Sequence, residues 1–339
     1  MRNADTSRLN NMKVCIIGCG AIGGMLAAFL ARAEVEVTVI DKGTQYAALR
    51  ERGLTLVDTS DAKIEVDTLR VETRLPPGES FDALFLAVKA HEIETLAADI
   101  SHALGDSNLL ITLQNGLPWW YFQRYEGALA GKVLQSTDPG GRLTQLIDPE
   151  QILGCVAYPA AEVTAPGVIR HLEGIRFPLG ELDGRVTGRA ESVSNLLVSA
   201  GLKSPVLTNI REEIWLKAWG NMAFNPISAL THATMADIAR FQPTRDYVAE
   251  LMREAEEVAH QLGIRFRVPL ERRLEGAEKV GAHKTSMLQD VLANRPLETD
   301  AILGSIVEMA SLVEIKVPQL SGLYAMTRLR DRVNGDAQV

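Results

Sequence analysis

The chain has 339 residues, more than one hydrophobic core usually serves, and 46% of them are hydrophobic, as in a folded protein of two domains. Its formal net charge of -8 and its pI near 5.4 argue against nucleic acid or an anionic membrane as a partner, because phosphate binding normally needs a dense basic surface.

The N-terminal stretch 1–11, MRNADTSRLNN, is polar and lacks the apolar centre of a secretory signal. We expect it to be a disordered leader, with folding starting at Met12. No later apolar run is long enough to cross a bilayer. Cys15, Cys19 and Cys155 are odd in number and lack a metal-binding spacing, which suggests reduced thiols in a cytoplasmic protein. The six histidines do not cluster either, so we expect no metal site.

The first half alternates apolar runs with amphipathic segments. The runs are apolar on consecutive residues, which indicates a parallel sheet covered by helices on both faces, a Rossmann-type doubly wound α/β domain over 12–205. Strands are expected at 12–18, 35–41, 82–89 and 108–116, with helices at 23–33 and 91–104.

After Lys132 the apolar runs shorten and alternate with turn residues. We expect three of them, at 152–163, 167–173 and 175–180, to be antiparallel strands that finish the same sheet, and 189–201 to be a closing helix.

From about Val206 the pattern is almost wholly helical, which places a domain boundary there and predicts an all-helical domain over 206–332. Its expected helices lie at 208–224, 247–263, 284–293 and 299–315.

The sequence GCGAIGG follows the first expected strand and opens the first helix. Gly18, Gly20 and Gly23 have the spacing in which glycines permit a tight turn, a close approach to a pyrophosphate, and close packing of helix on strand. The free N–H groups of a helix start, around Ala21 and Ile22, would face the phosphates. This predicts a dinucleotide site.

Asp41 ends the second strand, near where an acidic residue would bind the ribose 2′-hydroxyl of NAD. The adjacent Lys42 would instead pair with the 2′-phosphate of NADP. A third interpretation is a solvated charge pair without a ligand.

Lys217, Asn221 and Asn225 recur every four residues, so on a helix they form one stripe among apolar neighbours. Polar groups in such surroundings need hydrogen-bonding partners, and a polar substrate would serve. Alternatively, Lys217 extends to solvent and Asn225 ends the helix before Pro226.

Six motifs in order resemble the ketopantoate reductase family: GCGAIG, Lys89 in LAVKA, Asn115 in LQNG, the K-x-x-x-N-x-x-x-N-P stretch, TSMLQD and RPLETD. The resemblance runs from Met12 to the C-terminal helix. It implies a helical domain like that of 6-phosphogluconate dehydrogenase, and reduction of 2-dehydropantoate to (R)-pantoate with NADPH for pantothenate synthesis. NAD(H) stays open as the cofactor because of Asp41.

The resemblance implies roles for individual residues. Lys217 would be catalytic and Glu298 would join it at the reacting oxygen. Asn221 and Asn225 would bind substrate, and Ser286 would contact its carboxylate end.

Lys89 and Asn115 match family residues on the cofactor side, and Asn115 is also a candidate for substrate binding. The chemistry agrees with this assignment, because hydride delivery to a ketone builds negative charge on its oxygen and so needs a proton donor there. We expect the active site in the cleft between the two domains.

Two features depart from the family pattern. Thr231 and Thr234 are the nearest polar residues where some members place another asparagine, and Trp119 and Trp120 add bulk after the LQNG motif. A related dehydrogenase for a different 2-oxo acid or 2-hydroxy acid is therefore an alternative function, and a dinucleotide sensor without catalysis is another. The apolar helical domain is compatible with a homodimer.

Overall fold

The computed structural model describes residues 12–105, 108–279, 281 and 284–336, so the expected leader lies outside the described residues. The described chain divides into two compact units, which we call the sheet unit and the helical unit. Two short segments of the first half belong to the helical unit. The boundary near residue 206 stays a prediction. Of the described residues, the sheet unit holds 12–105, 108–114, 122–132 and 142–210, and the helical unit holds 115–121, 133–141, 211–279, 281 and 284–336.

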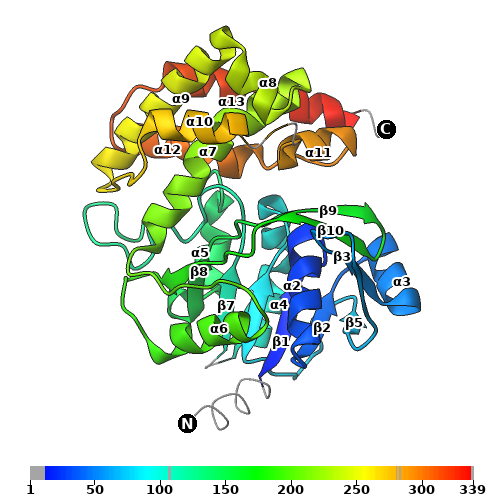
Figure 1. The fold of residues 1–339 in the computed structure, drawn as a ribbon. Coiled ribbons are helices and arrows are strands. Elements are labelled where there is room, and N and C mark those ends of the chain that lie inside the picture. The colour runs from blue at the N-terminus through cyan, green and yellow to red at the C-terminus, as the bar shows by residue number, and fades with distance from the viewer. Residues whose placement is uncertain (1–11, 106–107, 280, 282–283, 337–339) are drawn as a thin grey trace. The chain divides into compact units, whose positions relative to one another are not determined.

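The sheet unit is built on a seven-stranded sheet in the order β11-β8-β7-β6-β1-β2-β5 (Figure 1). All neighbouring pairs are parallel except β11 with β8. The predicted doubly wound sheet is confirmed. Its strands are β1 (Lys13–Ile17), β2 (Glu36–Ile40), β5 (Arg70–Glu72), β6 (Ala83–Leu86), β7 (Leu109–Thr112), β8 (Ile152–Cys155) and β11 (Leu179–Glu181).

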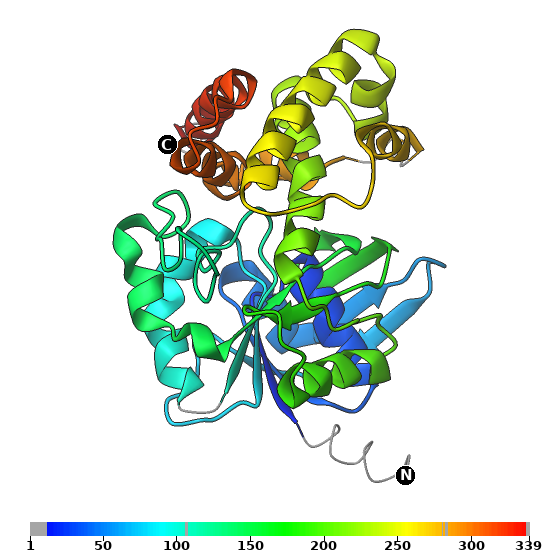
Figure 2. The same ribbon diagram turned by 90° about the vertical axis from the view of Figure 1, so that its left-hand side faces the viewer.

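Helices cover both faces of this sheet. Figure 2 shows α4 and α5 on one face and α2 and α6 on the other. Right-handed crossovers on either side of β1 account for α2, α4 and α5, whereas α6 follows the edge strand β11. The helices of the unit are α2 (Ala21–Arg32), α3 (Gly43–Arg52), α4 (Ile93–Leu104), α5 (Arg142–Leu146) and α6 (Gly188–Ser199).

A second, four-stranded sheet corrects the prediction for the segments after Lys132. Only β11 finishes the first sheet as an antiparallel strand, while β8 pairs in parallel with β7. The remaining segments join two strands that the sequence patterns did not predict, and this sheet packs on the outer side of α2. Its order is β4 (Lys63–Val66), β3 (Leu54–Val57), β10 (Val168–Glu173) and β9 (Ala160–Ala165).

The second sheet exists because α2 is apolar on more than one side. The interior of the sheet unit includes Met25, Leu26 and Leu30 of α2 together with Ile169 of β10. A Cβ on Gly24 would lie 2.7 Å from the Ile169 side chain, so the missing side chain lets β10 approach. An apolar surface on the outer side of α2 needs such a cover.

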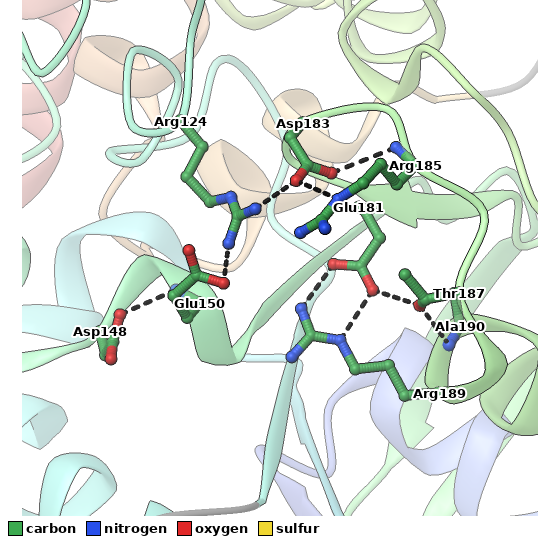
Figure 3. A network of polar contacts seen from close by, with 9 residues as sticks. All are labelled: Arg124, Asp148, Glu150, Glu181, Asp183, Arg185, Thr187, Arg189 and Ala190. Carbon is green, nitrogen blue, oxygen red and sulfur yellow. Dashed lines mark hydrogen bonds and ion pairs between the residues drawn. The ribbon is translucent and has the colours of Figure 1, made fainter.

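Charged side chains fasten the antiparallel edge of the first sheet (Figure 3). Glu181 of β11 is 4% exposed and accepts from Arg189 Nε at 2.7 Å and from the hydroxyl of Thr187, the N-cap of α6. Arg124 pairs with Asp183, two residues further on. A buried carboxylate needs such partners, and the hydrogen bonds of Glu181 to Thr187 and Arg189 attach β11 to α6.

The helical unit is organised around α7, whose Trp215 and Trp219 are fully buried. Trp219 stacks on Phe266 with ring centroids 4.2 Å apart. The helix continues through Pro226 and does not end at Asn225. The helices of this part are α7 (Ile210–Thr231), α8 (Met235–Arg240), α9 (Gln242–Gln261), α10 (Leu270–Lys279), α11 (Ser286–Leu292), the π-helix η4 (Asp300–Gly304), α12 (Ser305–Leu312) and α13 (Pro318–Asp336).

Within the described ranges, none of the helices combines the length and the apolar character that a bilayer crossing needs.

The cysteines provide a test of the sheet unit. Cys15, Cys19 and Cys155 are buried and form no disulfide. Burial, with a smaller contribution from the charge of Asp41, raises the pKa of Cys19 to about 12. Since the thiolate is the reactive form, we expect the native protein to react slowly with a thiol reagent at mildly alkaline pH, and the urea-unfolded protein to react quickly at all three cysteines. Rapid labelling of the native protein would contradict this packing.

Candidate active site

The glycine loop has the geometry of a phosphate site. Gly18 has a φ of +95°, which favours glycine, and a Cβ on Gly23 would lie 1.9 Å from the Gly18 carbonyl oxygen. A Cβ on Gly20 would meet nothing within 4 Å, so the loop is open there. Ala21 and Ile22 begin α2, whose first turn carries no acidic residue and no side-chain cap. The N–H groups and the dipole of this helix start therefore favour an anion.

The loop lies at the point where the sheet changes direction. It follows β1, and the connection after β6 passes beside it, with Val88 Cγ1 2.8 Å from where a Cβ of Gly18 would be. Lys89 follows and begins the turn η1 (Ala90–Glu92), in which its N–H donates to Glu92 Oε2 at 3.3 Å. In doubly wound sheets, ligands bind at this place.

The end of β2 adjoins the same loop. Asp41 Oδ2 accepts the Cys19 N–H at 2.6 Å, and Oδ1 accepts the Lys42 N–H at 2.7 Å. Burial raises the pKa of Asp41 from its ordinary value, against the opposing effect of these two hydrogen bonds. Lys42 Nζ lies 3.4 Å from Glu92 Oε1, and its side chain is 81% exposed. Asp41 is thus attached to the loop, whereas Lys42 extends into solvent.

In the helical unit, an amide joins an amine to a carboxylate. Lys217 Nζ donates to Asn115 Oδ1 at 2.8 Å, and Asn115 Nδ2 donates to Glu298 Oε2 at 3.2 Å. Glu298 is 7% exposed and Lys217 is half-buried. We call these three residues the Lys–Asn–Glu chain. Asn115 occupies the space between the two charges, an arrangement that the sequence did not predict.

The other predicted residues of α7 lie on the same side of the helix. Asn221 is half-buried and Asn225 is buried. Asn225 Nδ2 donates to Ser286 Oγ at 3.4 Å, a weak bond to an exposed serine at the start of α11. The structure therefore brings Asn225 and Ser286 together, and Lys217 with Asn115 and Glu298.

A glycine fixes the Asn115 segment against the π-helix. Gly116 has a φ of +78°, and a Cβ there would lie 2.0 Å from the Ala301 carbonyl oxygen. The next N–H, of Leu117, donates to that oxygen at 3.0 Å. Only glycine permits this approach, so Gly116 contributes to the position of Asn115.

The two tryptophans beyond this segment are part of the protein interior. Trp119 and Trp120 are 2% and 1% exposed. Tyr121 then contacts α7 twice: its hydroxyl accepts from Trp215 Nε1 at 2.7 Å, and its carbonyl accepts from Arg211 Nε at 2.8 Å. These contacts attach the segment to α7 and account for the bulky residues by packing.

The two threonines beyond α7 make local hydrogen bonds. Thr231 Oγ1 donates to the Ile227 carbonyl at 2.7 Å, and Thr234 caps α8 by accepting from the Asp237 N–H.

An amine held in this way is suited to carbonyl chemistry. Lys217 donates one N–H to Asn115, and an ammonium group has three donors in all, which is the chemistry that a developing oxyanion requires. Glu298, through Asn115, supplies the negative charge that a partly buried ammonium requires. The sequence indicated all three residues, but the bridging amide and Gly116 depend on contacts between distant segments.

Two family models match the chain. The one described as ketopantoate reductase PanE/ApbA covers residues 14–184, and the one described as ketopantoate reductase PanE/ApbA C terminal covers 209–331. A 2-dehydropantoate 2-reductase of Mesorhizobium japonicum is 42% identical over 94% of this chain and 97% of its own.

Solved structures have the same fold. One assigned to the ketopantoate reductases, from Ralstonia solanacearum, is 35% identical with a TM-score of 0.90 and covers 96% of this chain and 99% of its own. A D-mandelate dehydrogenase solved with NADH and anilino(oxo)acetate is 20% identical with a TM-score of 0.80, covering 95% and 99% of the two chains. At that identity the likeness concerns the fold alone.

Gly116→Ala tests the contact with the π-helix. The added Cβ would overlap the Ala301 carbonyl, so we expect a loss of unfolding free energy about 2 kcal/mol greater than in a matched variant without the overlap. Gly263→Ala is that control, because Gly263 has a φ of +79° but open space around it. Urea unfolding measures both. Equal losses would show that the approach at Gly116 is relaxed at no cost.

Proposed function

The chain belongs to the ketopantoate reductase family, and we propose that it reduces the C2 ketone of 2-dehydropantoate to (R)-pantoate, a step of pantothenate biosynthesis. The observation that carries the proposal is the Lys–Asn–Glu chain, an amine held by an amide that also contacts a buried carboxylate. A purely structural lysine on a solvated face would need neither partner.

In this proposal a bound reduced nicotinamide supplies the hydride, and the residues of the helical unit manage the charge that results. The Lys217 ammonium faces the ketone oxygen and gives it a proton from Nζ as negative charge develops there. Asn115 orients the amine through its carbonyl oxygen. Glu298, at the other side of the amide, stabilises the charged form of the amine before transfer.

The amides and the hydroxyl along α7 and α11 serve the rest of the substrate. Asn221 and Asn225 offer donors and acceptors for a hydroxyl, and Ser286 lies where it can donate to the substrate carboxylate. The alternative of a different, bulkier 2-oxo acid drew on Asp41 and on Trp119 and Trp120. The burial of the two tryptophans removes one reason, and Asp41 concerns the choice of dinucleotide and not the choice of 2-oxo acid. The family substrate is therefore the better proposal.

For the dinucleotide, the family resemblance favours NADP(H) and the residues after β2 favour NAD(H). A 2′-phosphate near Asp41 would also face Glu92, which already pairs with Lys42. Ribose hydroxyls would find spare lone pairs on the Asp41 carboxylate, because each of its oxygens accepts one backbone N–H. The open first turn of α2 fits the pyrophosphate of either dinucleotide. We propose that NAD(H) is preferred.

We further propose that the protein is cytoplasmic and that it forms a homodimer. Three buried cysteines that form no disulfide suit the reducing conditions of the cytoplasm. Met326, Leu329 and Val333 form an exposed apolar face on α13, to which a second copy could pack in a homodimer.

Lys217→Ala tests the proton donor. Loss of a positioned acid typically costs about 10²- to 10⁴-fold, so we expect kcat with 2-dehydropantoate to fall by that factor. Binding of the dinucleotide, followed by fluorescence titration, should not change. Lys316→Ala, an exposed lysine of the same unit, is the control and should keep full activity. Undiminished turnover in Lys217→Ala would exclude the mechanism.

The cofactor proposal is tested by kcat/KM for NADH and for NADPH. We expect NADH to be preferred at least about tenfold in the wild type, the effect of roughly 1.4 kcal/mol of electrostatic discrimination. Asp41→Asn should reduce the preference, while Asp67→Asn, an exposed carboxylate of the same unit, should leave it unchanged. A wild-type preference for NADPH would show that Lys42 leaves Glu92 to receive a 2′-phosphate.

A further inference from the structure

The π-helix begins two residues after Glu298 and contributes to the site through one carbonyl. Ala301 O accepts the Leu117 N–H at 3.0 Å and the Ser305 hydroxyl at 2.7 Å. π-helical turns are rare and are found frequently at functional sites. In η4, the Ala301 carbonyl oxygen accepts hydrogen bonds from outside the backbone hydrogen-bond ladder of the helix, and one of them comes from the Asn115 segment. Glu298 and Asn115 therefore depend on the same short stretch of backbone.

A tyrosine of α13 contacts both ends of that stretch. The Tyr324 hydroxyl donates to Asp300 Oδ1 at 2.5 Å, at the first residue of the π-helix. At its last residue, a Cβ on Gly304 would lie 2.9 Å from the same hydroxyl oxygen. The guanidinium of Arg328 lies 5.6 Å from the centre of the tyrosine ring and limits its movement.

The glycine at position 304 is explained by this contact and not by its backbone. Its φ of -56° and ψ of -42° are ordinary helical values, which any residue adopts. Glycine inside a helix costs about 1 kcal/mol relative to alanine. The Tyr324 hydroxyl occupies the space that a side chain at position 304 would need. Glycine therefore makes the helix locally less stable but leaves room for the hydroxyl.

We infer that Tyr324 is a positioning residue for the reaction: through Asp300 and Gly304 its hydroxyl fixes the π-helix that aligns Glu298 and Asn115 on Lys217. The inference rests on the proposed function. The connection runs from Tyr324 to the π-helix, from Ala301 to the Asn115 segment, and from Asn115 to the amine. Tyr324 itself touches no reacting atom in this proposal.

Burial and the nearby Asp300 charge raise the pKa of Tyr324 to about 12. The hydroxyl therefore stays protonated and donates throughout the neutral range.

Tyr324→Phe removes the hydroxyl and keeps the ring. We expect kcat to fall about tenfold with little change in KM, because small misplacements of catalytic groups act mainly on the transition state. The pH profile of kcat should shift, since the separation of Glu298 from the amine changes. Exchange of the Leu117 amide hydrogen should become faster, because its acceptor is no longer held. This last readout is independent of turnover.

Further variants separate positioning from general destabilisation. Asp300→Asn keeps an acceptor for the hydroxyl and should behave nearly as wild type, whereas Asp300→Ala should resemble Tyr324→Phe. The double variant of Tyr324→Phe and Asp300→Ala should be no worse than either single one, because both changes break the same contact. Tyr247→Phe, which loses a hydroxyl bonded to Gln319 O in the same unit, is the control.

Several outcomes would overturn the inference. Wild-type kcat, pH profile and Leu117 exchange in Tyr324→Phe would do so, and so would equal losses in Tyr247→Phe. If the wild type itself turns over no 2-oxo acid, the proposed function fails, and unchanged Leu117 exchange in Tyr324→Phe would then show separately that the π-helix does not depend on the tyrosine.

Discussion

The site depends on one electrostatic constraint, which is that an amine and a carboxylate taken out of water each need a partner. Lys217 and Glu298 meet this need through the two ends of one amide, that of Asn115. A direct ion pair would hold the proton on the amine more firmly, because an adjacent opposite charge favours the charged form. An intervening neutral amide weakens that attraction and gives each group one hydrogen bond.

The surrounding structure maintains this geometry from several directions. α7 carries the amine, and its buried Trp215 holds the segment that bears Asn115 through Tyr121. Gly116 brings the same segment onto the Ala301 carbonyl, next to the carboxylate. In the sheet unit the constraint is one of backbone geometry. The glycines after β1 leave the first turn of α2 without a side-chain cap, so its N–H groups are available to an anion. In the proposed function, the sheet unit binds the dinucleotide and the helical unit supplies the proton donor.

Local patterns predicted the parts of the fold that local energetics decide. The apolar runs of β1, β2, β6 and β7 and the glycine loop were identified, because buried parallel strands and a tight turn restrict the residues that fit them. The second sheet was missed because its strands β3 and β4 were not predicted, and because β9 was included in a strand expected to finish the first sheet. β10 was identified as a strand but assigned to the wrong sheet. Which strands pair depends on which surface of α2 is left uncovered, and the sequence of a single strand does not contain that information.

The same distinction applies to the site. The stripe on α7 was visible from its spacing, and the roles of its residues came from the family resemblance. The bridging position of Asn115, the contact of Gly116 with Ala301 and the π-helix join segments far apart in the chain. Residues 299–315 read as one continuous helix, because a π turn has no periodicity of its own over five residues.

The most direct test of the account is a crystal structure of the protein with oxidised dinucleotide and 2-dehydropantoate bound, a complex that cannot react. The account predicts that the ketone oxygen lies within hydrogen-bonding distance of Lys217 Nζ, with Asn115 still joining the amine to Glu298. A ketone oxygen bound away from Lys217, with the amine directed to solvent, would contradict it.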